Sequence, residues 1–393
     1  MSLVLTAPSH VTETVLSAPS QAIALVRDSS APPPKPGFSA IYRSSYSSSS
    51  SAPDHHDIVE IPEVLNSKET LEFFGLQPHV AEDIFNSWLR FQQTPGELGY
   101  EGDIISFTVY YVKSIARIIE DAWLPTHDWR RALAELGINR QLTDAIIDSN
   151  FDEVRKSRSA SAWVIDTFRT SWEFLQGLDK RVRRKKDEQN GLVAPSPSTA
   201  PRPAIDGRTM LHKGGAMTRL ASVFREDGSL HISRLFSPPP TDFHRERSDL
   251  LSFTELDIAK QYASFCQLRV PAEEGGVLTF AIPNELLGNF KEIEGQDWQQ
   301  LLWWARRRPE SLDEIDPPAS LAGYLEAPLL IGVICGTATD KIDQLQSSCE
   351  LSGQYMKTRT DDTNASQYVF QSRALQGHIQ NQCAGWVWIR SSQ

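Results

Sequence analysis

The spacing of apolar residues divides the chain into two parts with different periodicity. Between residues 58 and 188, apolar side chains recur at steps of three and four, which is the period of an amphipathic helix. The clearest series lie at 84–91, 104–119 and 163–178. Gly137 follows Leu136 where one helix should end, because glycine adopts the left-handed backbone of a C-terminal cap without steric cost. The pattern predicts several helices in this part of the chain.

Beyond residue 207, short apolar runs typical of strands alternate with helical stretches. The predicted strands lie at 210–212, 230–235, 277–282, 329–335, 367–370 and 386–389. Predicted helices lie at 257–267 and 298–308. The sequence therefore predicts an α+β fold class, in which an N-terminal all-α domain is followed by a mixed α/β domain.

Composition sets the expected domain bounds. Residues 1–56 are rich in serine, alanine and proline, and such a segment buries too little apolar surface to offset the entropy of ordering, so we predict a disordered tail. We assign residues 57–188 to the all-α domain, 189–206 to a linker and 207–393 to the mixed α/β domain. A chain of 393 residues is long enough for two cores.

The charge balance is acidic. Lysine and arginine total 39 against 50 aspartate and glutamate residues, a net charge of −11, which argues against nucleic acid as the main ligand. The basic run at 181–186 is either the solvated end of a helix, a nuclear-import signal or an anion-binding patch. The four cysteines show no CxxC spacing, and no apolar segment is long enough to cross a bilayer. We expect an intracellular protein, cytoplasmic or nuclear, with no membrane partner.

Several common chemistries lack their motifs. The chain has no phosphate-binding P-loop, no GxGxxG, no GxSxG nucleophile elbow and no HExxH metal motif. His55 and His56 lie in the predicted tail and adjacent residues do not share a face, so we predict no metal site. Trp303 and Trp304, followed by arginines at 306–308, either stack on a nucleotide base or are core tryptophans before a basic helix end.

Three short segments of the second domain carry the remaining candidate chemistry. They lie at 211–215, 252–263 and 367–370. The first holds a basic residue before two glycines, the second leads from Ser-Phe-Thr into a helix, and the third begins with Gln-Tyr. In this order they resemble the three strand motifs of the ADP-ribosyltransferase superfamily. More specifically, residues 212–389 resemble an uncharacterised fungal protein family with a degenerate form of this fold.

The resemblance implies NAD as the cofactor. Lys213 and Gly214 occupy the place of the family's basic residue and glycine, and His212 is the alternative if the register shifts by one. A shift of one residue in a strand turns the side chain to the opposite face, so only one of the two fits. Ser252 and Thr254 match the second motif, and a purely structural reading makes Thr254 the N-cap of the following helix.

The third motif departs from the family. Gln367 stands where the resemblance implies a catalytic glutamate, and an amide offers no full negative charge to a cationic transition state. Glu255, Asp249 or Asp362 would substitute if the fold brought one close. We therefore expect a catalytically degenerate nucleotide-binding or protein-interaction module, and an active NAD-dependent mono-ADP-ribosyltransferase is the alternative. A protein partner would bind the helical domain, for example through its apolar face at 163–172.

Overall fold

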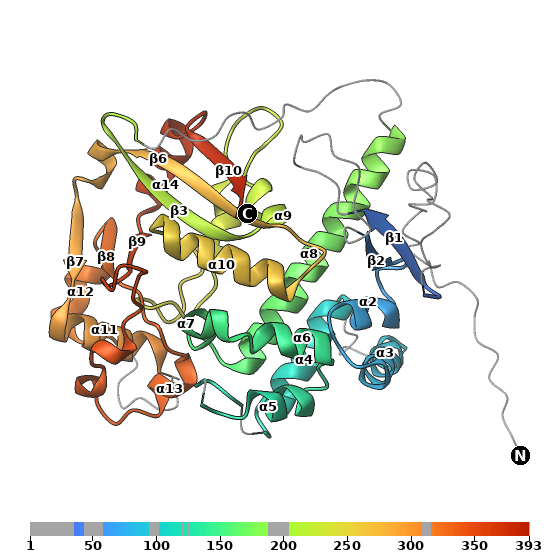
Figure 1. Ribbon diagram of the computed structural model, residues 1–393. Coiled ribbons are helices and arrows are strands. Elements are labelled where there is room, and N and C mark those ends of the chain that lie inside the picture. The colour runs from blue at the N-terminus through green and yellow to red at the C-terminus, as the bar shows by residue number, and fades with distance from the viewer. Residues whose placement is uncertain are drawn as a thin grey trace, which may run out of the picture. The chain divides into compact units, whose positions relative to one another are not determined.

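The structure is a computed structural model of the 393-residue chain, and it describes residues 35–42, 58–93, 102–119, 121–124, 126–187, 204–307 and 316–392. Most of the predicted tail, including His55 and His56, and most of the predicted linker lie outside these residues. The chain forms two compact units (Figure 1). Unit 1 comprises residues 1–108 and 175–191, and unit 2 comprises residues 109–174 and 192–393.

Unit 1 combines a small sheet with helices. Strand β1 (Phe38–Tyr42) pairs antiparallel with β2 (Ile58–Pro62), so part of the segment predicted as a tail forms a strand. The helices are α2 (Lys68–Phe73), α3 (Pro78–Gln92), the start of α4 (Ile104–Ala116) and the end of α8 (Ala160–Asp187). The Ser67 hydroxyl accepts a bond from the Thr70 backbone N–H at 3.2 Å and caps α2. The basic run at 181–186 lies on α8, and its side chains are outside the described residues.

Unit 2 begins with the rest of α4 and a series of short helices. They are α5 (Trp129–Glu135), α6 (Arg140–Ile146), α7 (Asp152–Arg155) and the first half of α8. Gly137 has a φ of 76° after α5, which confirms the predicted helix end. Asn139 then accepts a bond from the Leu142 backbone and caps α6. These helices were assigned to an all-α domain from the sequence, yet residues 109–174 belong to the same compact unit as the large sheet.

The sheet of unit 2 is mixed and has eight strands among the described residues. They are β3 (Arg208–Ala216), β4 (Phe236–Ser237), β5 (Leu250–Thr254), β6 (Gly275–Pro283), β7 (Phe290–Ile293), β8 (Leu329–Val333), β9 (Ser366–Phe370) and β10 (Val387–Ser391). Their order is β10-β6-β3-β5-β9-β8-β7, with β4 paired to β5. Only β7 and β8 pair in parallel within this sheet. The architecture is thus a mixed arrangement of helices and strands, as the predicted α+β class requires.

Helices cover both faces of this sheet. They are α9 (Met217–Ala221), α10 (Leu256–Arg269), α11 (Gly295–Arg306), α12 (Ala322–Leu325), α13 (Thr339–Asp343) and α14 (Arg373–Gln382). One strand prediction was wrong: residues 230–235 end in a 3-10 helix, Ile232–Leu235. Leu230 and Ile232 alternate like a strand, but Leu235 follows Ile232 by three residues, and all three side chains are buried in the core.

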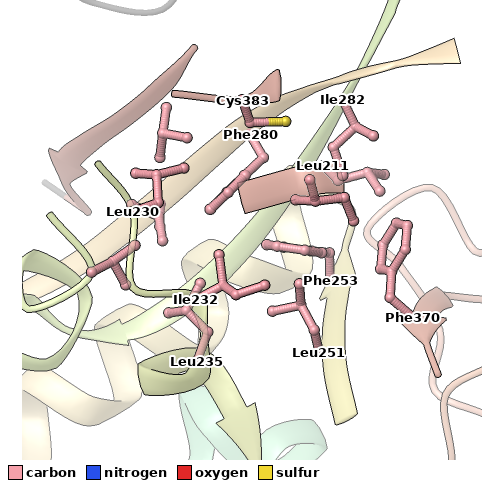
Figure 2. Close-up of a cluster of buried hydrophobic side chains, with 14 of the residues drawn as sticks. Leu211, Leu230, Ile232, Leu235, Leu251, Phe253, Phe280, Ile282, Phe370 and Cys383 are labelled. Carbon is pink, nitrogen blue, oxygen red and sulfur yellow. The ribbon is translucent and has the colours of Figure 1, made fainter. Parts of the chain in front are cut away.

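Two apolar clusters lie on opposite faces of the sheet. The first contains Leu211, Phe253, Phe280 and Phe370 and is closed by residues of the 3-10 helix (Figure 2). The second contains Leu250 and residues of α11. Successive side chains of a strand point to opposite faces, so neighbouring residues contribute to different clusters. In β9, Phe370 belongs to the first cluster and Val369 to the second. Strand β6 is buried along its whole length.

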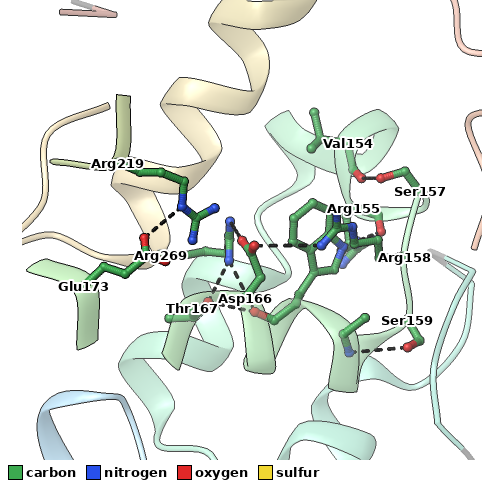
Figure 3. Close-up of polar contacts among 12 residues, drawn as sticks. Val154, Arg155, Ser157, Arg158, Ser159, Asp166, Thr167, Glu173, Arg219 and Arg269 are labelled. Atoms are coloured by element: carbon green, nitrogen blue, oxygen red, sulfur yellow. Dashed lines mark hydrogen bonds and ion pairs between the residues drawn. The ribbon is translucent and has the colours of Figure 1, made fainter. Parts of the chain in front are cut away.

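A partly buried ionic network joins α8 to helices α9 and α10 of unit 2 (Figure 3). Arg269 at the end of α10 is 3% exposed in its side chain and binds Asp166 of α8 at 2.7 Å. The same guanidinium donates to the Thr167 hydroxyl at 2.7 Å. Arg219 of α9 binds Glu173 of α8 at 2.8 Å. The first half of α8 is therefore held to α9 and α10 by paired charges. Among the residues that the structure describes, no helix combines the length and the apolar character needed to span a bilayer.

Candidate functional site

The three strands that carry the predicted motifs are neighbours at the centre of the sheet. Strand β5 lies between β3 and β9. His212 is paired with Thr254, and Thr254 with Gln367, so the three residues occupy consecutive positions in one row across the sheet. Paired residues project from the same face. Residues 42 and 113 positions apart in the chain thus contribute neighbouring side chains, as roughly 5 Å separates neighbouring strands.

Lys213 lies where β3 separates from β5. The two strands share one pairing, His212 with Thr254, and β4 pairs with the same edge of β5 at Leu250 and Leu251. Between these pairings the Lys213 ammonium donates to the Ser252 carbonyl oxygen at 3.1 Å and lies 3.4 Å from the Ser252 hydroxyl. The Lys213 ammonium thus donates the hydrogen bond to the Ser252 carbonyl oxygen that a backbone N–H of β3 would donate if the two strands were still paired there.

The electrostatic surroundings of Lys213 are unusual for a lysine. The Ser252 hydroxyl bonds to that of Ser237 at 2.8 Å, so the ammonium faces neutral oxygens. Burial, then the nearby cations Arg219 and Arg158, lower the pKa of Lys213 to about 8. At neutral pH the side chain is still mainly charged. It is a cation with no carboxylate partner among the described residues.

His212 projects from the face opposite to Lys213, as neighbours in a strand must. Its Nδ1 lies 3.0 Å from the Thr279 hydroxyl. Burial and the Arg390 cation lower the pKa of His212 to about 4, so the ring is neutral at pH 7. The fold thus brings His212 and not Lys213 onto the face of Thr254 and Gln367, while Lys213 reaches Ser252 through the gap between the strands.

Gly214 is required by helix packing. A Cβ atom at this position would lie 1.7 Å from the carbonyl oxygen of Ala259 in α10. Only glycine allows the helix to approach β3 this closely. The space beside the Gly214 backbone on this face is therefore occupied by α10.

Gln367 belongs to a buried polar network that the sequence did not predict. Its side-chain amide donates to Asp242 Oδ2, which also accepts the Cys335 backbone N–H at 2.9 Å. Arg306 forms an ion pair with the other oxygen of Asp242 and donates to the Thr339 hydroxyl at 3.0 Å. Asp242 is 5% exposed. Burial alone would lower the pKa of Arg306, but the Asp242 carboxylate raises it above the usual value.

Of the three acidic residues considered as substitutes, Glu255 lies beside the row. Its Oε1 accepts the Ser366 backbone N–H at 3.0 Å, and its Oε2 lies 2.8 Å from the Thr254 hydroxyl. Asp249 instead binds Arg247, before the other end of β5. Asp362 has a φ of 62° in an exposed turn.

The predicted capping role of Thr254 was wrong. The N-cap of α10 is Glu255, and its side chain makes no capping hydrogen bond. The Thr254 hydroxyl contacts two acceptors, Glu255 Oε2 at 2.8 Å and the Ser366 carbonyl oxygen at 2.9 Å. Thr254 therefore ties β5 to β9 beside Gln367, one residue earlier than a cap would lie.

The other predicted aromatic features are engaged within the chain. Trp303 and Trp304 pack against the second core cluster. The guanidinium of Arg307 lies 4.5 Å from the Trp303 ring centroid, and that of Arg245 lies 4.9 Å from the Trp304 ring. The apolar face at 163–172, expected to bind a partner, is buried at Trp163, Phe168 and Trp172.

No three His, Cys, Asp or Glu side chains in the described part of the chain are grouped to hold a metal ion. In comparisons with known proteins, no family model, no curated protein and no solved structure matches the chain.

Proposed function

We propose that unit 2 is a catalytically degenerate ADP-ribosyltransferase-like module that binds NAD or an ADP-ribose-like ligand at the centre of its sheet. One observation carries the proposal: the three motif strands β3, β5 and β9 are adjacent, and His212, Thr254 and Gln367 occupy one row on one face. These side chains are half-buried, as are Lys213 and Ser252 beside them. A ligand at this row would contact residues from all three motifs.

Lys213 suits the phosphate part of such a ligand. Its ammonium faces the carbonyl and hydroxyl oxygens of Ser252 and has no carboxylate partner among the residues described. Arg219 and Arg158 also lie near Lys213, but each is itself ion-paired, Arg219 with Glu173 and Arg158 with Asp166. A protein with a net charge of −11 repels anions over most of its surface, so the ammonium of Lys213 is a specific place for a phosphate.

Gln367 suits binding better than transfer. Its amide N–H₂ donates to Asp242, and its side-chain oxygen is left as an acceptor for a ligand hydroxyl. A neutral acceptor does not stabilise developing positive charge as a carboxylate does, and loss of one electrostatic partner commonly costs about 10²–10³ in rate. We therefore assign Gln367 to ligand binding and expect little or no transfer.

The proposal is tested by calorimetric titration of NAD, ADP-ribose and nicotinamide into the full chain. We expect saturable binding of NAD and ADP-ribose, weakened at least about tenfold by Lys213→Ala, because a charge-assisted contact contributes about 1.5–3 kcal/mol. Lys260→Ala is the matched control, since Lys260 is an exposed lysine on α10. Equal affinities for wild type and Lys213→Ala, with both folded by thermal melting, would exclude Lys213 from the site.

One contact favours the second candidate, an active NAD-dependent mono-ADP-ribosyltransferase. Glu255 lies next to Thr254 and to the residue before Gln367, so its carboxylate offers the negative charge that Gln367 lacks. Incubation with labelled NAD separates the two functions. We expect no transfer of label to protein. Transfer that Glu255→Gln abolishes, without loss of NAD binding, would favour the enzyme.

A further inference from the structure

A second surface lies at the β10 edge of the sheet, outside the residues assigned to the proposed site. Trp386 is 40% exposed, and Trp388 is half-buried. Their ring centroids are 6.4 Å apart at an interplanar angle of 81°. The guanidinium of Arg208 lies 4.5 Å from the centroid of the Trp386 ring. Two indole rings and a cation are thus gathered at one edge.

This surface continues the row described above. Trp388 is paired with Thr279, and Thr279 with His212, so Trp388 lies two strands from His212, about 10 Å away. Arg390 follows Trp388 by two residues and projects from the same face. Arg390 is close enough to His212 to depress the pKa of the histidine.

The two arginines of this surface have no ion-pair partner in the part of the chain that the structure describes. Arg208 donates to the carbonyl oxygens of Ala281 at 2.7 Å and Gln382 at 3.4 Å. The Arg390 side chain makes no hydrogen bond among the described residues, while its backbone pairs with that of Val277 in β6. If Trp386 and Trp388 only covered the edge of the sheet, arginines without an ion-pair partner would not be needed beside them. In an acidic protein, indole rings beside unpaired arginines are complementary to an aromatic anion.

We infer that the surface formed by Arg208, Trp386, Trp388 and Arg390 binds the adenylate part of a nucleotide. Its base stacks on Trp388, and its phosphate is held by Arg390. Aromatic side chains bind bases through their π-faces, and arginine binds phosphate through its planar fork of donors. The inference rests on the proposed function, because it places one end of the NAD-like ligand about two strands from His212.

Calorimetric titration of AMP into the full chain tests the inference. We expect Trp388→Leu and Arg390→Gln each to weaken AMP binding at least about tenfold, which equals about 1.4 kcal/mol. Arg225→Gln, at an exposed arginine outside this surface, is the matched control. Nicotinamide mononucleotide, which lacks the adenylate, should bind all of these variants equally. Thermal melting verifies that each variant is folded.

The outcomes separate this inference from the proposed function. AMP binding that Trp388→Leu and Arg390→Gln leave unchanged, or no AMP binding to the wild type, overturns the inference. If NAD then still binds and depends on Lys213, the proposed function stands without it. If AMP binding depends on Trp388 while Lys213→Ala affects no ligand, the surface is a nucleotide site and the proposed central site is wrong.

Discussion

At the scale of single residues, the Asp242 carboxylate requires a hydrogen-bond donor at position 367, and the side-chain amide of Gln367 supplies it. The Asp242 carboxylate is buried and accepts bonds from Gln367, the Cys335 backbone and Arg306. A glutamate at 367 would bring a second carboxylate into contact with that of Asp242, which pairs with Arg306 through its other oxygen. Like charges at this distance cannot both ionise without a large free-energy cost. The glutamine is thus matched to its buried partner.

We therefore predict that Gln367→Glu destabilises the protein and that Asp242→Asn partly reverses the loss. The single change should lower the free energy of unfolding by about 2 kcal/mol, because a buried hydrogen bond becomes a repulsion. In the double variant, Asp242→Asn supplies a side-chain amide that can donate to the new carboxylate, so the two changes should couple by about 1 kcal/mol or more. Urea unfolding of the four proteins measures the coupling.

The exposed Gln344→Glu variant controls for the added charge and should change stability by less than about 0.5 kcal/mol. If the effects of Gln367→Glu and Asp242→Asn on the free energy of unfolding were strictly additive, the contact with Asp242 would not be the reason that position 367 requires an amide. The same four proteins also test transfer of ADP-ribose, and we expect Gln367→Glu alone to give none, because the Asp242 carboxylate opposes ionisation of the new glutamate.

The sequence predicted some members of this site and missed others for a physical reason. The order of three motifs gave Lys213 for the first strand, with His212 as the alternative, and Thr254 and Gln367 for the other two. The sheet places His212, and not Lys213, in one row with Thr254 and Gln367. The contacts of Asp242 with Gln367 and Arg306 were not predicted, because these partners lie 125 and 64 residues away from it in the chain. Such contacts exist only once the strands have paired.

At the scale of elements, periodicity located the strands and helices of the sheet well but did not give their pairing. Strands β3, β6, β8, β9 and β10 and helices α10 and α11 each overlap a predicted segment. The two-residue strand β4 is too short to show a hydrophobic period, and no sequence pattern indicates where β3 separates from β5. The register depends instead on close contacts between elements, of which the approach of α10 to β3 is the tightest at a glycine.

Gly214→Ala and Gly215→Ala form a matched pair that tests this approach. The added methyl at 214 would lie 1.7 Å from the Ala259 carbonyl oxygen, whereas nothing lies within 4 Å of a Cβ at 215. We expect Gly214→Ala to lower the free energy of unfolding by about 1–3 kcal/mol, since α10 must shift. Gly215→Ala should change it by less than about 0.5 kcal/mol.

Urea denaturation of both variants measures the difference. Equal stability of the two would mean that α10 does not pack on β3 as described. A Gly214→Ala variant of normal stability that has lost NAD binding would instead assign the glycine to the ligand, as the family resemblance implies.

At the scale of the whole molecule, composition predicted a boundary between helices and sheet that the compact units do not follow. The Pro- and Ser-rich segment at 189–206 suggested that the helical residues fold separately. Instead, residues 109–174 share a compact unit with the sheet, and polar contacts of Arg269 with Asp166 and Thr167 join α8 to α10, the helix that packs on β3. Arg269 would be left as an uncompensated charge without α8, so experiments on this protein require the full chain.

The Arg269–Asp166 pair gives the stability of the molecule a defined pH dependence. Burial would raise the pKa of Asp166, but Arg269, Arg158 and Arg219 together lower it from 3.8 to about 2. A carboxyl whose pKa is lower in the folded state stabilises the fold above its unfolded pKa, and this contribution is lost as the pH falls through the folded pKa. The shift corresponds to about 2 kcal/mol, present above pH 4 and lost towards pH 2.

Asp166→Asn should therefore lower the free energy of unfolding by about 2–4 kcal/mol at pH 6, because it also leaves buried Arg269 without its countercharge. The difference from wild type should shrink between pH 4 and pH 2.5, where the carboxyl becomes protonated in the unfolded state while it stays mainly ionised in the folded state. Urea unfolding at pH 6, 4, 3 and 2.5 measures it, with the exposed Asp206→Asn variant as control. A difference that stays constant over this range would mean that the Asp166 charge does not stabilise unit 2.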